Sequence, residues 1–225
     1  LRGLSGFPED LDIWEGRIRR IDYCFHFNLG ENINSYIDLI SYLYYPHRSR
    51  EVYANDPNGG TDNGVRFYCT SSQCKFYDKG FSSSAKDFQG VLRMESSLCR
   101  PGAFKRALDL DSPTKLNEIN SDMLKALLLK DLHVLGLDLP YVVDANAAFD
   151  LLEAKYGTKK ALVLRDTLEE LSRSKEFSIK QIGINLGVGK STVYKRISEI
   201  KRVSLVPALN MSGKRLSPLT EFLVS

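Results

Sequence analysis

The chain contains few residues of the kinds that form covalent or metal cross-links. It has four cysteines among 225 residues, none in a Cys-x-x-Cys pair, and only three histidines. This argues against a disulfide framework and a cysteine zinc site, so we expect reduced thiols. No run approaches the roughly 20 apolar residues of a membrane span, and the first residues lack the layout of a signal peptide. We therefore expect a soluble, intracellular protein with no membrane partner.

What the chain does contain is ordinary for a folded protein. Its 43% hydrophobic and 26% charged residues are typical of globular domains, and 225 residues make one large domain or two small ones. The charge is uneven, because residues 179–225 hold eight basic and two acidic residues while the rest is slightly acidic. A basic C-terminal quarter indicates a polyanionic partner, since phosphate neutralisation supplies affinity for nucleic acid.

The hydrophobic pattern changes near residue 100. Before it, alternating aromatic and β-branched residues predict strands, with one helix ended by a proline and a turn rich in glycine and asparagine over residues 56–64. The strands are expected at 16–29, 51–54, 65–70, 74–79 and 91–98, and the helix at 31–45. Beyond it, apolar residues at helical spacing predict helices at 102–108, 122–135, 144–155 and 159–173. The predicted fold class is α+β: an antiparallel sheet with packed helices, followed by an all-α region.

Residues 177–197 resemble the helix-turn-helix of resolvases and repressors. Gly183 would let two helices approach closely, and glycines 187 and 189 suit a turn with left-handed backbone. Apolar residues bury the inner sides of both helices, which leaves five residues facing outward as candidate DNA contacts: Lys190, Ser191, Thr192, Lys195 and Arg196. Ser191 and Thr192 also suit a helix cap. The alternative is a helical pair that only packs, with its lysines in water.

These patterns divide the chain into five parts. They are an N-terminal segment at 1–16, an α+β domain at 17–110, a helical spacer at 111–173, the helix-turn-helix region at 174–205 and a tail at 206–225.

If the predicted strands pair as a sheet, alternation puts the polar groups of each strand on one face of that strand, within reach of those on the other strands. The group comprises two carboxylates, three cations and a phenol: Asp22, Glu95, Lys75, Lys79, Arg93 and Tyr77. Such groups support phosphoryl transfer to tyrosine, in which carboxylates hold a hard divalent cation and the phenol attacks the phosphate. The alternative is a packed tyrosine among surface ion pairs.

Three motifs, in this order on successive predicted strands, resemble those of the gene II replication initiators of filamentous phages and related plasmid initiators. They are Arg-Ile-Asp at 20–22, Phe-Tyr-Asp-Lys at 76–79 and Leu-Arg-Met-Glu at 92–95, within a matching span of about residues 17–106. The resemblance implies that the α+β domain is a rolling-circle nuclease. Such initiators nick one strand of origin DNA, stay on the 5′ phosphate through tyrosine, and rejoin the ends after synthesis.

Carried over by residue, the resemblance makes Tyr77 the nucleophile and Lys79 the lysine that steadies the phosphate. It makes Asp22 and Glu95 candidate ligands for Mg²⁺ or Mn²⁺, with Arg93 neutralising a phosphate or orienting Glu95. It also implies origin DNA, single-stranded or supercoiled, and a host replication helicase as partners. The expected location is the cytoplasm of a bacterium that hosts a phage, prophage or plasmid.

Two features depart from the wider rolling-circle group and its relatives. No His-x-His pair is present, so a metal site must be argued from carboxylates. His26 lies on the predicted face of Asp22, either as a nitrogen ligand or as a structural histidine. Family members usually carry a further segment before the Arg-Ile-Asp strand, whereas only residues 1–16 precede it here, as expected of a chain truncated at its N-terminus.

Several other interpretations stay open. Tyr68 is a second nucleophile, a platform for base stacking, or a packed core residue. The helix-turn-helix alone also fits a non-enzymatic DNA-binding regulator or a site-specific recombinase. Residues 187–191 lack the spacing of a Walker phosphate loop and a preceding strand, so we reject nucleotide binding there.

Overall fold

The structure is a computed structural model that describes residues 18–53, 63–83, 86–109, 115–140, 144–173, 175–176, 178–209 and 216–223. The predicted N-terminal segment at 1–16 lies outside these residues, as does most of the turn predicted at 56–64.

A five-stranded antiparallel sheet forms the front of the molecule, as the alternating segments predict. Its strands are β1 (Ile21–Asn28), β2 (Ser49–Tyr53), β3 (Gly64–Tyr68), β4 (Ser72–Asp78) and β5 (Val91–Leu98), in the order β1-β5-β4-β3-β2. All four neighbouring pairs are antiparallel. Several boundaries differ from the prediction: β1 begins at Ile21 and not at residue 16, and β3 ends at Tyr68 and not at residue 70. Lys79 does not end a strand but begins the short helix α2 (Lys79–Ser83).

Helices account for most of the remaining described chain. Those near the sheet are α1 (Ile33–Tyr42), α3 (Pro101–Leu108) and α4 (Ser121–Leu135), with short 3-10 turns η2 (Gly30–Asn32), η3 (Lys86–Phe88), η4 (Leu116–Glu118) and η5 (Leu219–Phe222). A second group comprises α5 (Ala145–Tyr156), α6 (Thr158–Leu171), α7 (Ile179–Asn185) and α8 (Lys190–Lys201). Strands before residue 100 and helices after it confirm the α+β fold class.

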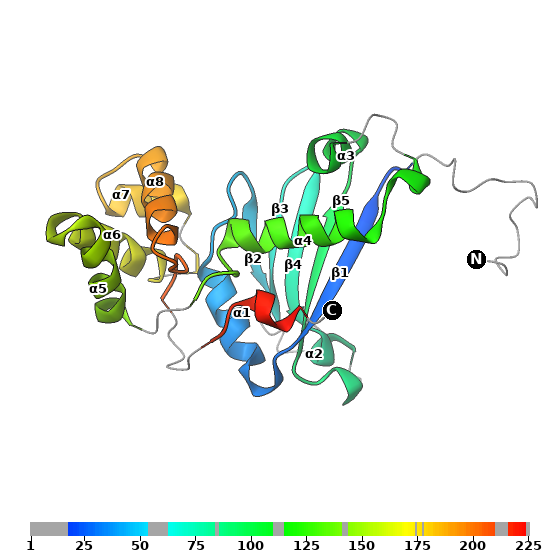
Figure 1. Ribbon diagram of the computed structural model, residues 1–225, viewed down its shortest axis with the longest axis horizontal. Helices are drawn as coiled ribbons and strands as arrows, with labels where there is room; N and C mark the ends of the chain where they lie inside the picture. The colour runs from blue at the N-terminus through cyan, green and yellow to red at the C-terminus, as the bar shows by residue number, and fades with distance from the viewer. Residues whose placement is uncertain are drawn as a thin grey trace, which may run out of the picture.

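One face of the sheet is covered and forms the main core. Figure 1 shows α1 and α4 lying across that face, with the C-terminal segment beside them. Phe67, Phe76 and Met94 point into this layer and are fully buried, together with Ile40 of α1 and Leu132 of α4. Because side chains alternate along each strand, the polar residues between them lie on the opposite face.

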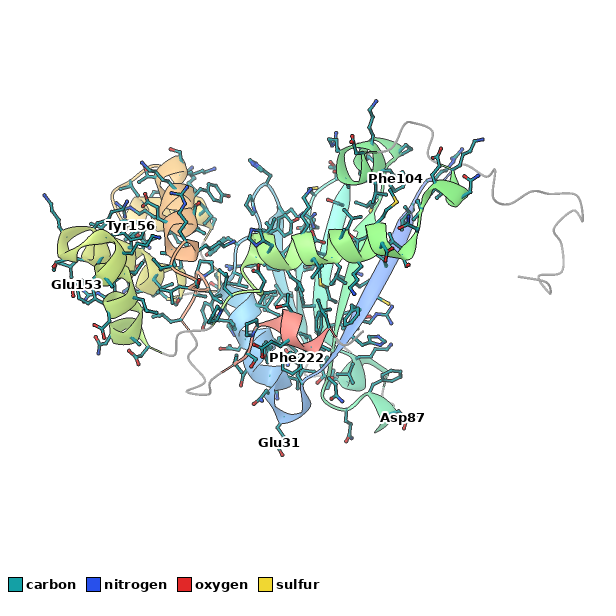
Figure 2. The ribbon with its side chains drawn as sticks, viewed as in Figure 1. Glu31, Asp87, Phe104, Glu153, Tyr156 and Phe222 are labelled. Atoms are coloured by element: carbon teal, nitrogen blue, oxygen red, sulfur yellow. The ribbon has the colours of Figure 1, made fainter. Side chains whose placement is uncertain are left out.

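The predicted spacer and tail both contribute to this core. Leu128 and Leu132 of α4 are buried in it, and so are Val206, Leu216 and Leu219 from the C-terminal segment. Figure 2 labels Phe222 of that segment, whose ring meets the Tyr36 ring at 6.2 Å between centroids. Helical spacing showed that the segment at 122–135 had an apolar side, but it did not show that the sheet is what this side covers.

Helices α5 to α8 form a second packed group beside β2 (Figure 1). Ala148, Leu164 and Ile200 share one small core, and the Tyr156 hydroxyl, labelled in Figure 2, donates to the backbone oxygen of Glu199 at 3.0 Å. Within the described ranges, we find no helix with the combined length and apolar character needed to traverse a bilayer.

Candidate functional site

The open face of the sheet carries a lattice of polar side chains. Across the strands, Glu95 of β5 stands opposite Cys24 of β1 and Lys75 of β4, while Arg93 stands opposite His26 and Tyr77. Residues opposite one another in antiparallel strands share a face and lie close together. The register therefore brings Tyr77, Arg93 and Glu95 together, as the sequence predicts.

Tyr77 and Glu95 are in direct contact. The Tyr77 hydroxyl donates to Oε2 of Glu95 over 3.3 Å, and the tyrosine is half-buried, not sealed in the core. Tyr77 is two residues along β4 from Lys75, whose register partner is Glu95, so the phenol reaches the carboxylate diagonally. The phenol oxygen has a carboxylate beside it that can accept its proton.

Two cations flank the same carboxylate. Lys75 Nζ lies 3.7 Å from Oε1 of Glu95, and Arg93 Nη2 lies 3.4 Å from Oε2. The Arg93 Nε is buried without a hydrogen-bond partner in the described part of the chain, so the guanidinium retains an unused donor. Alternation along the strand placed Lys75 on the face of Tyr77, two residues before it, but the family resemblance gave Lys75 no role.

Asp22 lies on the same face, at the diagonal position from Glu95. Its register partner is Ser97, two residues beyond Glu95 along β5. Arg20 Nε donates to both carboxylate oxygens of Asp22, at 3.0 and 2.8 Å. Burial raises the pKa of Asp22, but hydrogen bonds from Arg20 and Ser97 outweigh it, so the net pKa is lowered and the carboxylate stays charged at neutral pH.

The two acids provide oxygen donors of the type that a hard cation takes. No group of three or more ligating side chains forms among the described residues. Mg²⁺, however, usually binds proteins through one or two carboxylates, with substrate phosphates and waters completing its shell. Asp22 and Glu95, on one face and at diagonal positions, fit that smaller donor set.

Lys79 and His26 lie at the edge of this group. Lys79 begins α2, and its Nζ lies 5.7 Å from the centre of the Phe88 ring. Burial, then the charges of Arg93 and Lys79, lower the pKa of His26, so its imidazole is neutral at pH 7. Its ring packs edge-on against Phe88 at 5.8 Å between centroids.

A second candidate region lies at α7 and α8, which are joined by four residues. Gly187 has a φ of +65°, the left-handed backbone predicted for this turn, whereas Gly189 has a φ of −76° and is extended. A Cβ on Gly183 would lie 2.6 Å from the backbone oxygen of Val188, which confirms that glycine permits the close approach. Ile182, Val193 and Ile200 are fully buried, as expected.

The five predicted DNA contacts do not all face outward. Lys190, Ser191 and Lys195 are exposed and Thr192 is half-exposed. Arg196 departs from the prediction, because its Nη1 donates to Thr167 Oγ1 of α6 at 3.1 Å. The cap prediction is also wrong, since Gly189 is the N-cap residue and no side chain caps the helix.

Further basic residues at the start of β2 escaped the sequence analysis. Arg48 and Arg50 line a cavity of about 830 Å³ with Lys180, Lys190 and Tyr194 of α7 and α8. The run Tyr-Tyr-Pro-His-Arg-Ser-Arg at 44–50 was the available signal, since two tyrosines and two arginines lie within seven residues there.

Comparison with known proteins identifies no relative: no family model, curated protein or solved structure matches the chain.

Proposed function

We propose that the protein is a rolling-circle replication initiator that nicks and rejoins one strand of origin DNA through Tyr77. The observation that carries the proposal is the contact between the Tyr77 hydroxyl and Glu95 on an open, cation-rich sheet face. A phenol paired with a carboxylate and flanked by Lys75 and Arg93 combines a nucleophile, a proton acceptor and phosphate-binding charge.

The nicking step replaces one phosphodiester bond by another. The Tyr77 oxygen forms a bond to phosphorus as its proton passes to Glu95, and the bond between phosphorus and the 3′ oxygen breaks. The 3′ oxygen takes up a proton from solvent, to which Glu95 returns the one that it accepted, and leaves as a hydroxyl while the 5′ phosphate stays on tyrosine. The reverse reaction rejoins the strand, so no external energy source is needed.

Positive groups offset the charge that builds on the phosphate during this exchange. Arg93 lies between His26 and Tyr77 in the sheet register and has an unpaired Nε among the described residues. Lys75 adds a second charge next to Glu95, and Lys79 follows Tyr77 at the start of α2. We assign Arg93 and Lys75 to the phosphate, with Lys79 as a further cation at the margin.

Asp22 and Glu95 are the residues that would hold Mg²⁺ or Mn²⁺. When bound, such an ion polarises the phosphate and helps the leaving oxygen depart. The ion pair with Arg20 keeps Asp22 ionised, and a metal ion that binds Asp22 would have to displace Arg20 from the carboxylate.

Helices α7 and α8 supply origin recognition in this proposal, as a helix-turn-helix. Lys190, Ser191 and Lys195 are exposed near the start of α8, where such a helix meets the major groove. The setting would be the cytoplasm of a bacterium hosting a phage, prophage or plasmid, with the host replication helicase as the partner that opens the nicked duplex.

The direct test uses a pool of single-stranded oligonucleotides with a randomised centre, because it requires no knowledge of the origin sequence. The full chain is incubated with this pool and Mn²⁺, denatured in detergent, and separated by size. A nicking tyrosine gives a protein band that carries nucleotides and survives denaturation. If no such band forms, the covalent step is wrong.

One observation favours a second function, that of a non-enzymatic DNA-binding regulator. Both acids already have cationic partners, Arg20 for Asp22 and Lys75 with Arg93 for Glu95. Ion pairs of this kind also stabilise a sheet whose open face has no catalytic role. A regulator would bind duplex DNA through α8 and form no adduct with the oligonucleotide pool.

A further inference from the structure

Two hollows meet between the sheet and helices α7 and α8. Their volumes are about 830 and 600 Å³, and both are lined by Arg48, Ser49 and Tyr194. The larger extends along the starts of α7 and α8 to Lys180 and Lys190, and the smaller extends along the end of β3 to Tyr68. Because they share these lining residues, the two hollows adjoin, and we call them together the junction groove.

The junction groove is strongly basic. Five of the residues that line its larger part are cationic and one is acidic: Arg48, Arg50, Lys175, Lys180 and Lys190 against Glu176. Lys175 is paired with Asp38 at 2.5 Å. Lys180 and Lys190 are exposed and form no ion pair with any residue that the structure describes. The groove therefore presents uncompensated positive charge to a ligand.

Arg48 is fixed at the point where the two hollows join. Its guanidinium stacks on the Tyr45 ring at 3.8 Å, and its Nη2 lies 3.9 Å from the buried carboxylate of Asp131. Asp131 is itself held by the Tyr45 hydroxyl at 2.7 Å and the Ser96 hydroxyl at 2.8 Å. A cation positioned by a buried network loses little freedom when an anion binds beside it.

Aromatic rings line the groove next to these charges. Tyr194 of α8 borders both hollows and Tyr68 borders the smaller one, and both rings are half-exposed. The Arg66 guanidinium lies 4.7 Å above the Tyr68 ring, and Arg66 faces Lys75 across the sheet. Charge and rings thus continue from α8 to the open face that carries Tyr77.

We propose that the junction groove binds a single strand of DNA and leads it from α8 to the open sheet face. Basic grooves with exposed aromatic rings suit unpaired strands, because each free base offers a face for stacking while the phosphates meet the cations. Paired bases in a duplex have no free faces for Tyr68 and Tyr194. The inference rests on the proposed function, since it assigns to the groove the strand that Tyr77 would attack.

The test measures binding of the full chain to dye-labelled oligothymidylate, which forms no duplex, by fluorescence anisotropy at several salt concentrations. The variant is Lys180→Glu and its matched control is Lys159→Glu. Each lysine is exposed and is the second residue of its helix, α7 or α6, so both changes place the same charge at the same helical position. Only Lys180 lines the groove.

We expect Lys180→Glu to weaken binding about tenfold at low salt. It should also reduce the slope of log affinity against log salt concentration by about 0.7 or more, as loss of a phosphate contact does. Lys159→Glu should bind like the parent chain. Tyr68→Leu should weaken binding roughly fivefold or more, with an unchanged slope, because it removes stacking and no charge. Equal binding of oligothymidylate by the two lysine variants would overturn the proposal.

Failure of this inference and failure of the nicking proposal give different results. If the parent chain forms no adduct but Lys180→Glu still loses binding, the groove assignment stands and the covalent step falls. If an adduct forms and Lys180→Glu binds normally, the groove assignment alone falls.

Discussion

Tyr77 and Glu95 lie on neighbouring strands with the tyrosine hydroxyl 3.3 Å from a carboxylate oxygen. The contact depends on the register of β4 with β5, which puts Arg93 directly opposite Tyr77 and Lys75 directly opposite Glu95. A shift of one residue would turn one of the partners toward the core. The register of this one strand pair therefore decides whether a phenol, an acid and two cations can work together.

The first prediction concerns the carboxylate of Glu95. Glu95→Gln keeps the size of the side chain but removes the charge that accepts the tyrosine proton and binds a cation. We expect the rate of adduct formation with the oligonucleotide pool to fall roughly 100-fold or more. The thermal unfolding midpoint serves as the control, and Glu51→Gln, at the same level of the sheet on β2, should leave the rate unchanged.

The second prediction is that two neighbouring cations of α8 have different roles, one in DNA binding and one in stability. Lys195 is exposed, whereas Arg196 donates to Thr167 of α6. Lys195→Ala should weaken duplex binding and reduce the slope of log affinity against log salt by about 0.9, the value for one phosphate contact. Arg196→Ala should instead lower the thermal unfolding midpoint and leave that slope unchanged. The reverse pattern in anisotropy titrations would place Arg196 at the DNA.

These two residues illustrate what the sequence can and cannot predict. Helical spacing identified the buried side of α8 correctly, because Val193, Ile197 and Ile200 recur at the period of a turn. It did not predict the partner of Arg196, because a long side chain at the edge of that side reaches either water or a neighbouring helix. Arg196 contacts α6 because the fold places Thr167, 29 residues earlier in the sequence, beside it.

For the candidate site, the sequence likewise predicted which strand faces are polar but not which side chains pair. Alternation within each strand placed Asp22, Tyr77 and Glu95 on polar faces, and the structure puts those faces on one side of the sheet. The pairing of Arg20 with Asp22 was not predicted, although Arg20 is only two residues before Asp22 in the chain. The junction groove was beyond sequence reasoning, because its walls come from segments more than 100 residues apart.

The third prediction concerns Gly183. An alanine there would place its Cβ 2.6 Å from the backbone oxygen of Val188, which cannot move without changing the turn between α7 and α8. We expect Gly183→Ala to reduce the free energy of unfolding by about 1–3 kcal/mol, as overpacking does. The measurement is a denaturant titration followed by circular dichroism.

Gly102 provides the matched control for this substitution. It also lies in a helix, but nothing lies within 4 Å of its virtual Cβ. Gly102→Ala should therefore leave stability unchanged or raise it by about 0.5–1 kcal/mol, through helix propensity. Equal losses in the two variants would contradict the close approach at Gly183.

The fourth prediction concerns pH and the exposed thiol of Cys69. Burial raises the pKa of this thiol, but hydrogen bonds from Ser71 and Ser72 outweigh burial and bring it to about 6. The thiolate fraction should therefore rise as the pH increases through about 6, and alkylation by iodoacetamide should rise with it. Peptide mass spectrometry at several pH values measures the rate at each cysteine.

Cys74 and the two serines give the controls. Cys74 is buried and burial raises its pKa, so the native chain should leave it unmodified. The double variant Ser71→Ala with Ser72→Ala should move the alkylation midpoint of Cys69 to higher pH. A midpoint that stays near 6 in that variant would show that the serines are not the cause.

The most direct measurement of the central claim compares two tyrosine variants in the adduct assay with Mn²⁺. Tyr77→Phe removes the hydroxyl beside Glu95, whereas Tyr68→Phe removes one from the neighbouring strand β3, on the same open face. Our account predicts that Tyr77→Phe abolishes the denaturation-resistant adduct, that Tyr68→Phe retains it, and that mass spectrometry finds the nucleotide on the Tyr77 peptide. An adduct that persists in Tyr77→Phe would contradict it.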